Sequence, residues 1–221
     1  MVLARVLEPE VMDTPEEAEA YDAMDHTEVN RAFVTDFLAA GDIHGLVLDL
    51  GTGTAQIPVE LCLRHDDCYV MAADASVQML DLARYNIEIA GLIERIQLDH
   101  SDAKQLPYRD EYFVAVMSNS LIHHLPDPSV ALKEAIRVVE PGGLLFFRDL
   151  FRPETDEDVR RLVQAYAGDE DERQRQMFED SLRAALTVDE MRSLVAALGF
   201  DPETVQATSD RHWTWSAHKP K

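Results

Sequence analysis

The chain has 221 residues and a formal net charge of −22, from 20 basic and 42 acidic side chains. A negative charge of this size argues against nucleic acid and against an anionic membrane surface as partners, because both are themselves negative. No apolar run approaches the roughly 20 residues that span a bilayer. The length suits one α/β domain over residues 1–221, which we expect to be cytoplasmic.

Two helices are predicted ahead of the first strand, over residues 14–25 and 29–40. In each of them apolar side chains recur at spacings of three and four, which places them on one face of a helix. Gly41 follows the second helix and is typical of a helix end. We interpret residues 1–41 as lid helices that lie across the open end of a ligand site.

The next part of the chain alternates between short apolar runs and amphipathic stretches, which predict buried parallel strands and the helices between them. The predicted strands are 46–50, 69–74, 96–98, 113–117 and 144–147, and the predicted helices are 57–63, 77–90 and 128–139. Pro141-Gly142-Gly143 is predicted to be a turn before the last of these strands. Residues 46–152 are therefore expected to form a cofactor-binding core around a parallel sheet.

The alternation of strands and helices breaks after the fifth strand. Thr155 begins a predicted helix, a second helix covers residues 177–185, and together they are expected to form a helical insertion at 154–186. An acidic run at 169–172 separates the two helices. We interpret this run as a solvated face rather than a binding site.

The C-terminal part, residues 187–221, is predicted to contain one helix and two strands. Thr187 and Glu190 have the spacing of a capping box, which opens the helix. Strands at 204–208 and 212–218 are joined by a short link, which implies antiparallel pairing. The expected fold is α/β, a doubly wound and mostly parallel seven-stranded sheet with an antiparallel C-terminal edge pair.

The first strand ends at a glycine-rich turn, Gly51-Thr52-Gly53, and a helix follows, which places a ligand over the strand's carboxyl end. Asp74 ends the second strand, where a carboxylate can accept hydrogen bonds from ribose hydroxyls. A dinucleotide pattern requires glycine or alanine where this chain has Gln56. Asp49, two residues before Gly51, would repel a pyrophosphate but attract a cation. S-adenosylmethionine fits these residues better than NAD.

Five segments then share one interpretation: Asp49–Ala55, Asp74–Ser76, Ser101–Tyr108, Ser118–Pro128 and Val138–Gly143. In this order they resemble the motifs of class I S-adenosylmethionine-dependent methyltransferases of the small-molecule type 11 family. Ala55 departs from that pattern, because many members have glycine there. The resemblance covers about half of the chain and implies a Rossmann-like methyltransferase fold, S-adenosylmethionine as cofactor and S-adenosylhomocysteine as product.

The same resemblance implies a set of cofactor-binding residues. The turn would line the amino-acid part of the cofactor, Asp74 would hold the ribose, and Asp102 would accept from the adenine amino group. Tyr21 of the lid helices is expected to join this site. The full expected set is Asp49, Gly51, Thr52, Gly53, Asp74, Ala75, Met79, Ser101, Asp102, Ala103, Asn119 and Tyr21.

Methyl transfer from a sulfonium is an in-line displacement, so the protein mainly holds nucleophile, methyl and sulfur in line. A base is needed only if the acceptor must lose a proton. The candidate catalytic residues are His123, His124 and Asp149, with His26 and Tyr21 as further possible bases, and a structural role stays open for each. No metal-ligand set is recognised.

The leading hypothesis is a methyltransferase that acts on a small molecule, as a monomer or homodimer. The alternatives are a non-catalytic S-adenosylmethionine-binding regulatory module and, less favoured, an NAD(P)-dependent oxidoreductase. The loop at 118–121 lacks the Asn/Asp-Pro-Pro-Tyr sequence of nucleic-acid amino-methyltransferases. The acceptor and the atom that is methylated are not indicated.

Overall fold

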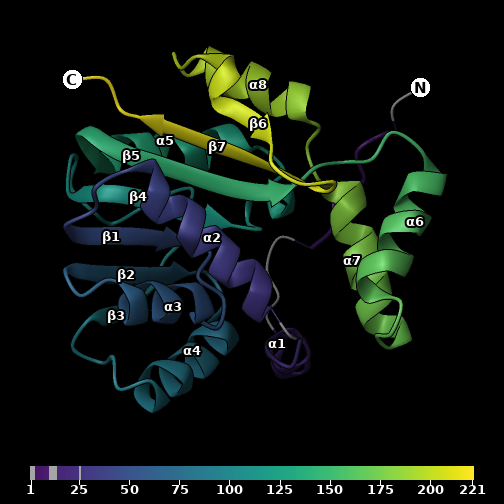
Figure 1. Cartoon of the computed structure of the whole chain (residues 1–221), viewed down its shortest axis with the longest axis horizontal. Coiled ribbons are helices and arrows are strands. Elements are labelled where there is room, and N and C mark those ends of the chain that lie inside the picture. The colour runs from purple at the N-terminus through teal and green to yellow at the C-terminus, as the bar shows by residue number, and fades with distance from the viewer. Residues whose placement is uncertain (1–2, 10–13, 25) are drawn as a thin grey trace. The chain divides into compact units, whose positions relative to one another are not determined.

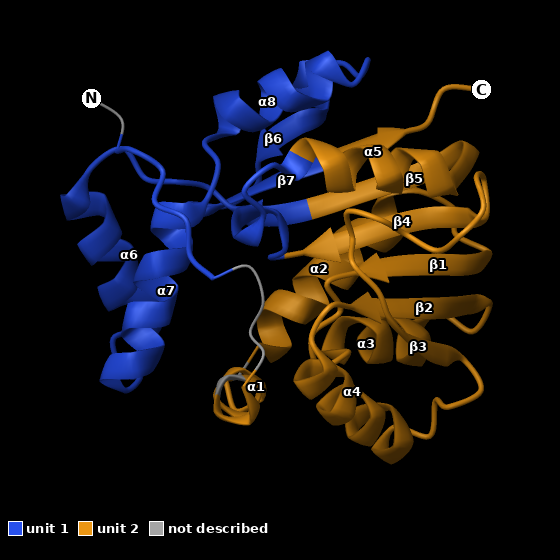
Figure 2. Cartoon of the chain, turned by 180° about the vertical axis from the view of Figure 1, so that it is seen from behind, with its two compact units in different colours: residues 1–10, 120–128, 148–215 blue, residues 11–119, 129–147, 216–221 orange. Residues whose placement is uncertain are grey.

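The computed structural model describes residues 3–9, 14–24 and 26–221, so residues 1–2, 10–13 and 25 of the expected lid segment lie outside the described part. The chain divides into two compact units, which Figure 2 shows in different colours. Unit 1 comprises residues 1–10, 120–128 and 148–215, and unit 2 comprises residues 11–119, 129–147 and 216–221. The expectation of one domain over the whole chain stays a prediction.

The strands form one seven-stranded sheet with the order β3-β2-β1-β4-β5-β7-β6 (Figure 1). Strand β1 pairs in parallel with β2 and β4, β2 pairs in parallel with β3, and β6 pairs antiparallel with β7. The strands are β1 Gly45–Leu50, β2 Cys68–Asp74, β3 Ile96–His100, β4 Phe113–Asn119, β5 Val139–Leu150, β6 Val205–Ala207 and β7 His212–His218. The predicted fold class is confirmed.

Unit 2 holds the larger apolar core. Its helices are α1 Pro15–Asp22, α2 Thr27–Ala40, α3 Gln56–Arg64, α4 Val77–Ile89 and most of α5 Pro128–Val138. Phe33 and Phe37 of α2 both meet the Phe146 ring edge-on, at centroid distances of 5.2 and 5.7 Å, and all three are buried. Burying one such side chain contributes about 1.5–3 kcal/mol, so α2 is firmly packed on this core.

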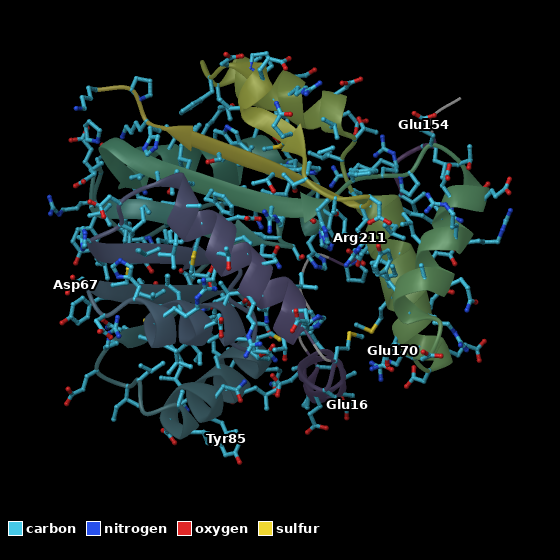
Figure 3. The ribbon with its side chains drawn as sticks, viewed as in Figure 1. Glu16, Asp67, Tyr85, Glu154, Glu170 and Arg211 are labelled. Atoms are coloured by element: carbon cyan, nitrogen blue, oxygen red, sulfur yellow. The ribbon has the colours of Figure 1, made fainter. Side chains whose placement is uncertain are left out.

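Unit 1 contains helices α6 Asp156–Ala167, α7 Glu172–Ala184 and α8 Val188–Ala197, and the short helices η1 Ile122–His124 and η2 Pro202–Thr204. Two expected helix starts are confirmed, because Thr155 caps α6 and Thr187 forms a capping box with Glu190 at α8. The middle helix begins at Glu172, earlier than the expected 177, because Asp171 caps it. The acidic run at 169–172 is exposed, and Figure 3 shows Glu170 at the surface of this unit. Among the described residues, no helix is long and apolar enough to cross a bilayer.

The predicted turn at 141–143 is wrong, because these residues belong to β5. The segment is held by the C-terminal residues: Gly142 N–H donates to the Lys219 carbonyl at 2.8 Å, and Lys219 N–H donates to the Gly143 carbonyl at 3.0 Å. Glycine is needed at 143 for a different reason than a turn. A Cβ there would stand only 2.7 Å from the Val114 carbonyl oxygen of β4.

Candidate active site

The turn after β1 has left-handed backbone conformations at three positions: φ is +69° at Gly51, +54° at Gly53 and +60° at Ala55. Glycine adopts such angles without strain, whereas an alanine costs about 1–2 kcal/mol. The turn is tied to β2, because Gly51 and Thr52 donate their N–H groups to the Ala73 carbonyl at 2.9 and 3.0 Å. The turn Gly51–Ala55 thus packs at the carboxyl ends of β1 and β2.

Asp74 is fixed by the backbone on both of its oxygens. Gly53 N–H donates to Oδ2 and Ser76 N–H donates to Oδ1, each at 2.8 Å. Burial raises the pKa of Asp74, although these two hydrogen bonds favour the ionised form. The Ala75 backbone also hydrogen-bonds to this carboxylate, and since a carboxylate has about four acceptor positions, one remains for a hydroxyl donor. Asp74 is therefore oriented as a ribose-binding residue requires.

Asp49 is an acid in the interior of unit 2, with 2% of its surface exposed. Burial raises its pKa to about 7, the nearby Thr52 side chain opposes this, and the charge of Asp74 adds to it. Near neutral pH the protonated and the ionised form of this carboxyl are consequently both populated. A cation beside it would favour ionisation.

Asp49 lines a small cavity beside the turn, together with Tyr21, Asn30, Gly51, Thr52, Thr54, Gln56, Ile57 and Asn119. Its volume is about 20 Å³, about the space that one water molecule needs, so only the end of a larger ligand would fit. Thr54 Oγ1 and Asn119 Oδ1 are buried there and have no hydrogen-bond partner among the described residues. An unpaired buried acceptor costs about 1–3 kcal/mol. The cavity therefore suits a ligand group that is cationic and donates hydrogen bonds, such as the ammonium of S-adenosylmethionine.

The expected adenine-side residues lie around the end of β2. Ser101 N–H donates to the Asp74 carbonyl at 3.0 Å, which brings the segment 101–103 beside Asp74. Met79 is buried, whereas Ala75 and Asp102 are exposed. One oxygen of Asp102 accepts from Lys104 N–H at 2.8 Å. The structure thus gathers all the predicted cofactor residues in unit 2, and their individual roles stay predictions.

Side chains of the lid helices bind the helices beside the turn. Gln56 at the start of α3 donates to Asp22 of α1 and accepts from Asn30 of α2, both at 3.1 Å. Asn86 of α4 also donates to Asp22, at 3.1 Å. Tyr21 lies next to the turn, with a ring carbon 3.7 Å from the position of a Cβ on Gly53. We name Asp22, Asn30, Gln56 and Asn86 the lid network.

The sequence indicated only part of this arrangement. Gln56 breaks the dinucleotide pattern and is visible in the sequence for that reason, but no local pattern indicates that Asp22 or Asn86 lies beside it. Polar side chains on amphipathic helices are common, so their pairing becomes visible only with the fold. The His26 ring lies 5.0 Å from the Tyr21 ring, centroid to centroid, in the same part of unit 2.

The candidate catalytic residues gather in unit 1. Asp149, near the end of β5, receives the His123 backbone N–H on Oδ2 at 3.0 Å, and its Oδ1 lies 2.5 Å from His123 Nδ1. The other ring nitrogen of His123 lies 3.3 Å from Glu8 Oε1. Burial opposes a charge on this ring, but the carboxylates of Asp149 and Glu8 outweigh it and raise the pKa of His123.

His124 behaves differently from its neighbour. Burial and the charge of His123 lower its pKa to about 3, so the ring is neutral. The two rings lie 4.2 Å apart, centroid to centroid. His123 has a carboxylate at each nitrogen and His124 is only weakly basic, so neither presents a nitrogen that is both free and basic near pH 7. Their catalytic role, like that of Asp149, stays a prediction.

Two residues of the N-terminal segment belong to the same cluster, and sequence reasoning missed both. Arg5 donates from Nη2 to the carbonyls of His123 and Leu125, at 3.0 and 2.9 Å, and from Nε to the Ala184 carbonyl at 2.6 Å. Glu8 faces both histidines. More than a hundred residues separate Glu8 from His123, and no local pattern indicates such a contact.

Comparisons with known proteins agree with this geometry. A family model described as a methyltransferase domain matches residues 48–147. The chain is 33% identical over 117 residues to the methyltransferase GfsG of Streptomyces halstedii, and the aligned segment covers 53% of this chain and 42% of that protein. It is 28% identical over 188 residues to the 27-O-demethylrifamycin SV methyltransferase of Amycolatopsis mediterranei, which covers 82% of this chain and 63% of that protein.

Among solved structures, a candidate S-adenosylmethionine-dependent methyltransferase from Methanococcus maripaludis shares the fold. It has a TM-score of 0.77 at 18% identity, and the match covers 98% of each chain. The chain spans less than two thirds of the length of the two curated relatives, namely 42% and 63%. Residues 48–147 therefore match a methyltransferase domain, and the chain has the fold of S-adenosylmethionine-dependent methyltransferases.

Proposed function

We propose that this chain binds S-adenosylmethionine at the glycine turn and transfers its methyl group to a small-molecule acceptor. The observation that carries the proposal is the pairing of Asp74, held by Gly53 and Ser76, with a cavity that contains buried Asp49 and an unpaired Asn119 oxygen. The first group suits a ribose and the second suits a cation that donates hydrogen bonds.

The protein's own contribution is binding, orientation and exclusion of water. When bound, the cofactor supplies a methyl group on a sulfonium. Asp74 would accept from a ribose hydroxyl, Thr54 and Asn119 would accept from the ammonium, and Asp49 would balance the positive charge. Tyr21 would cover the turn and keep water out, which favours an in-line displacement in a dry site.

The acceptor is proposed to be a small molecule, supported by the net charge of −22 and by the relative named for 27-O-demethylrifamycin SV. The lid helices and the helices at 154–186 are the proposed specificity elements. His123, His124 and Asp149 are proposed to assist only an acceptor that must lose a proton. A reducing, cytoplasmic setting is proposed as well, supported by Cys62 and Cys68, which are both free and buried.

The test is calorimetric titration with S-adenosylhomocysteine. Asp74→Ala is expected to weaken binding by about 1.5–3 kcal/mol, or about 10- to 150-fold, because it removes hydrogen bonds to a charged group. Asp81→Ala is the matched control, since Asp81 is an exposed acid on α4 that pairs with Arg84. Absence of binding at millimolar ligand, or equal affinity in both variants, would contradict the proposed site.

A second measurement separates an enzyme from the regulatory-module alternative. The cofactor is incubated with the protein and a panel of small hydroxyl, amine, thiol and carbon-acid acceptors, and formation of S-adenosylhomocysteine is followed. Transfer of the methyl to any acceptor supports the enzyme. Tight cofactor binding with no transfer across the panel favours the module.

A further inference from the structure

Glu8, His123 and His124 bring three potential metal-ligand atoms together in unit 1. Glu8 Oε1 lies 3.3 Å from His123 Nε2 and 3.2 Å from His124 Nδ1. All three atoms lie within 4.8 Å of one another. His123 is buried and the other two side chains are 11–13% exposed, so the group is largely shielded from water.

The His124 ring supplies the decisive detail. Its Nδ1 is buried and has no hydrogen-bond partner among the described residues, although it stands 3.2 Å from Glu8 Oε1. The ring also hydrogen-bonds to the backbone of Pro9, whose only polar group is a carbonyl. A neutral imidazole has a single N–H, which this bond uses. His124 Nδ1 therefore presents a lone pair to a carboxylate oxygen, an arrangement that is repulsive unless a cation or a proton lies between them.

We propose that Glu8, His123 and His124 bind one divalent transition-metal ion, and that Zn²⁺ suits them best. Two imidazole nitrogens and a carboxylate oxygen are a donor set that zinc accepts. Bonds of about 2.0–2.1 Å in a tetrahedral site place ligand atoms about 3.3 Å apart, and Glu8 Oε1 lies at 3.3 and 3.2 Å from the two imidazole nitrogens. Three protein ligands leave a fourth position for water or another ligand.

The residues around the three ligands orient them as partners of metal ligands do. A metal-bound histidine almost always donates its second N–H to a carboxylate or a carbonyl. His123 Nδ1 faces Asp149 Oδ1 at 2.5 Å, and the His124 ring donates to Pro9. The Ser181 hydroxyl lies 3.3 Å from each oxygen of Glu8 and can donate to it. Asp149 and Ser181 are thus positioning residues for this site.

The ion would join segments that are far apart in the chain. Glu8 belongs to the N-terminal segment, and both histidines belong to η1. Arg5 and Val6 of the same segment already bind the Leu125, Ala184 and Arg183 carbonyls. A bound metal would therefore fasten residues 5–9 to η1 and the end of α7, and it should stabilise unit 1. This proposal does not depend on methyl transfer.

The experiment uses the full chain without a histidine tag, freed of metal by a chelator and dialysed against Zn²⁺. We expect one zinc per chain by elemental analysis and a higher Tm in zinc than in chelator. Glu8→Ala and His124→Ala should each weaken zinc binding by about 100-fold or more, since loss of an outer partner alone costs about 10- to 100-fold. Asp149→Asn removes such an outer partner, so it should weaken zinc binding by about 10- to 100-fold.

The control is His44→Ala, since His44 is an exposed histidine between Asp42 and Asp67, at 2.9 and 3.5 Å, and Asp67 lies at the surface of unit 2 (Figure 3). This variant should keep the stoichiometry and affinity of the wild type. No zinc at micromolar free metal, wild-type zinc affinity in Glu8→Ala and His124→Ala, or loss of zinc in His44→Ala would overturn the proposal; the first result would leave a proton between Glu8 and His124. If a cluster variant does not fold, Co²⁺ bound to the wild type decides, because a tetrahedral site gives an intense visible absorption and surface binding does not.

Discussion

The glycine turn of unit 2 and the histidine cluster of unit 1 both bury charged side chains, but they balance charge in different ways. At the turn, the neighbours of Asp49 are a hydroxyl and a second acid, Asp74, so its negative charge is left for a ligand to balance. In the cluster, His123 lies between Asp149 and Glu8 and the charges offset each other. The difference teaches that a binding site can be recognised by a charge that its own fold leaves uncompensated.

The largest expected effect comes from breaking the compensated cluster. His123→Ala removes the cation between two largely buried carboxylates, and removing one member of a buried pair costs about 3–5 kcal/mol. Urea unfolding of metal-free protein measures the loss. His44→Ala, which removes an exposed histidine with 54% of its side chain accessible, should change stability by less than about 1 kcal/mol. Equal effects of both substitutions would mean that the cluster charges are not coupled.

Asp49, whose charge has no partner of opposite sign among the described residues, predicts that the stability of the protein depends on pH. The pKa of Asp49 is raised by burial from 3.8 to about 7, so between these values the folded state holds a proton that the unfolded state has lost. Stability therefore falls as pH rises through this window, by up to about 1.4 kcal/mol per pH unit. Asp49→Asn should remove this slope.

The measurement is urea unfolding of wild type and Asp49→Asn at several pH values between 4 and 7, the interval that the pKa shift defines. Only the difference between the two proteins is informative, because other acids titrate in the same interval. Parallel curves for the two proteins would show that Asp49 is not held in its acid form. Addition of S-adenosylhomocysteine tests the same carboxyl with a ligand present.

The smallest expected effect concerns the backbone of the turn. Ala55 has φ of +60°, so Ala55→Gly relieves about 1–2 kcal/mol of strain. Glycine also gives the unfolded chain more freedom, which costs about 0.5–1 kcal/mol, and a buried methyl group is lost. We expect a net stabilisation of about 0.5 kcal/mol by thermal or urea unfolding. A destabilisation of more than 1 kcal/mol would mean that packing of the Ala55 methyl outweighs the strain.

The two regions also differ in how far the sequence predicted them. The turn is made by residues close in the chain, and Asp74 ends the next strand. Local patterns were therefore enough to predict the positions of Gly51, Gly53 and Asp74 in the fold. The cluster joins Glu8 to His123 and Asp149, and no periodicity reports a contact over such a separation. The two histidines lie in a recognisable motif, whereas no motif indicates their carboxylate partner Glu8.

The wrong prediction at 141–143 and the missed contacts of Gln56 have the same origin. Pro141-Gly142-Gly143 has the composition of a turn, but pairing with Lys219 keeps it in β5, and Gly143 serves the close approach to β4. Likewise, Gln56 was correctly noted as a break in the dinucleotide pattern, but its bonds to Asp22 and Asn30 depend on where α1 and α2 lie. Local composition predicts local geometry, and long-range contacts decide what that geometry is used for.

The lid network has a consequence for the speed of ligand exchange. Three side-chain hydrogen bonds link Asp22 and Asn30 of the lid helices to Gln56 and Asn86. At about 0.5–1.5 kcal/mol each, breaking all three would leave an open form of the predicted lid about 10- to 2,000-fold less populated than the closed one. The apparent affinity for a ligand that enters only the open form is lower by the same factor. At high ligand concentration the observed association rate would then level off at the rate of lid opening. Asp22 accepts two of the three hydrogen bonds, so it would contribute most to that rate.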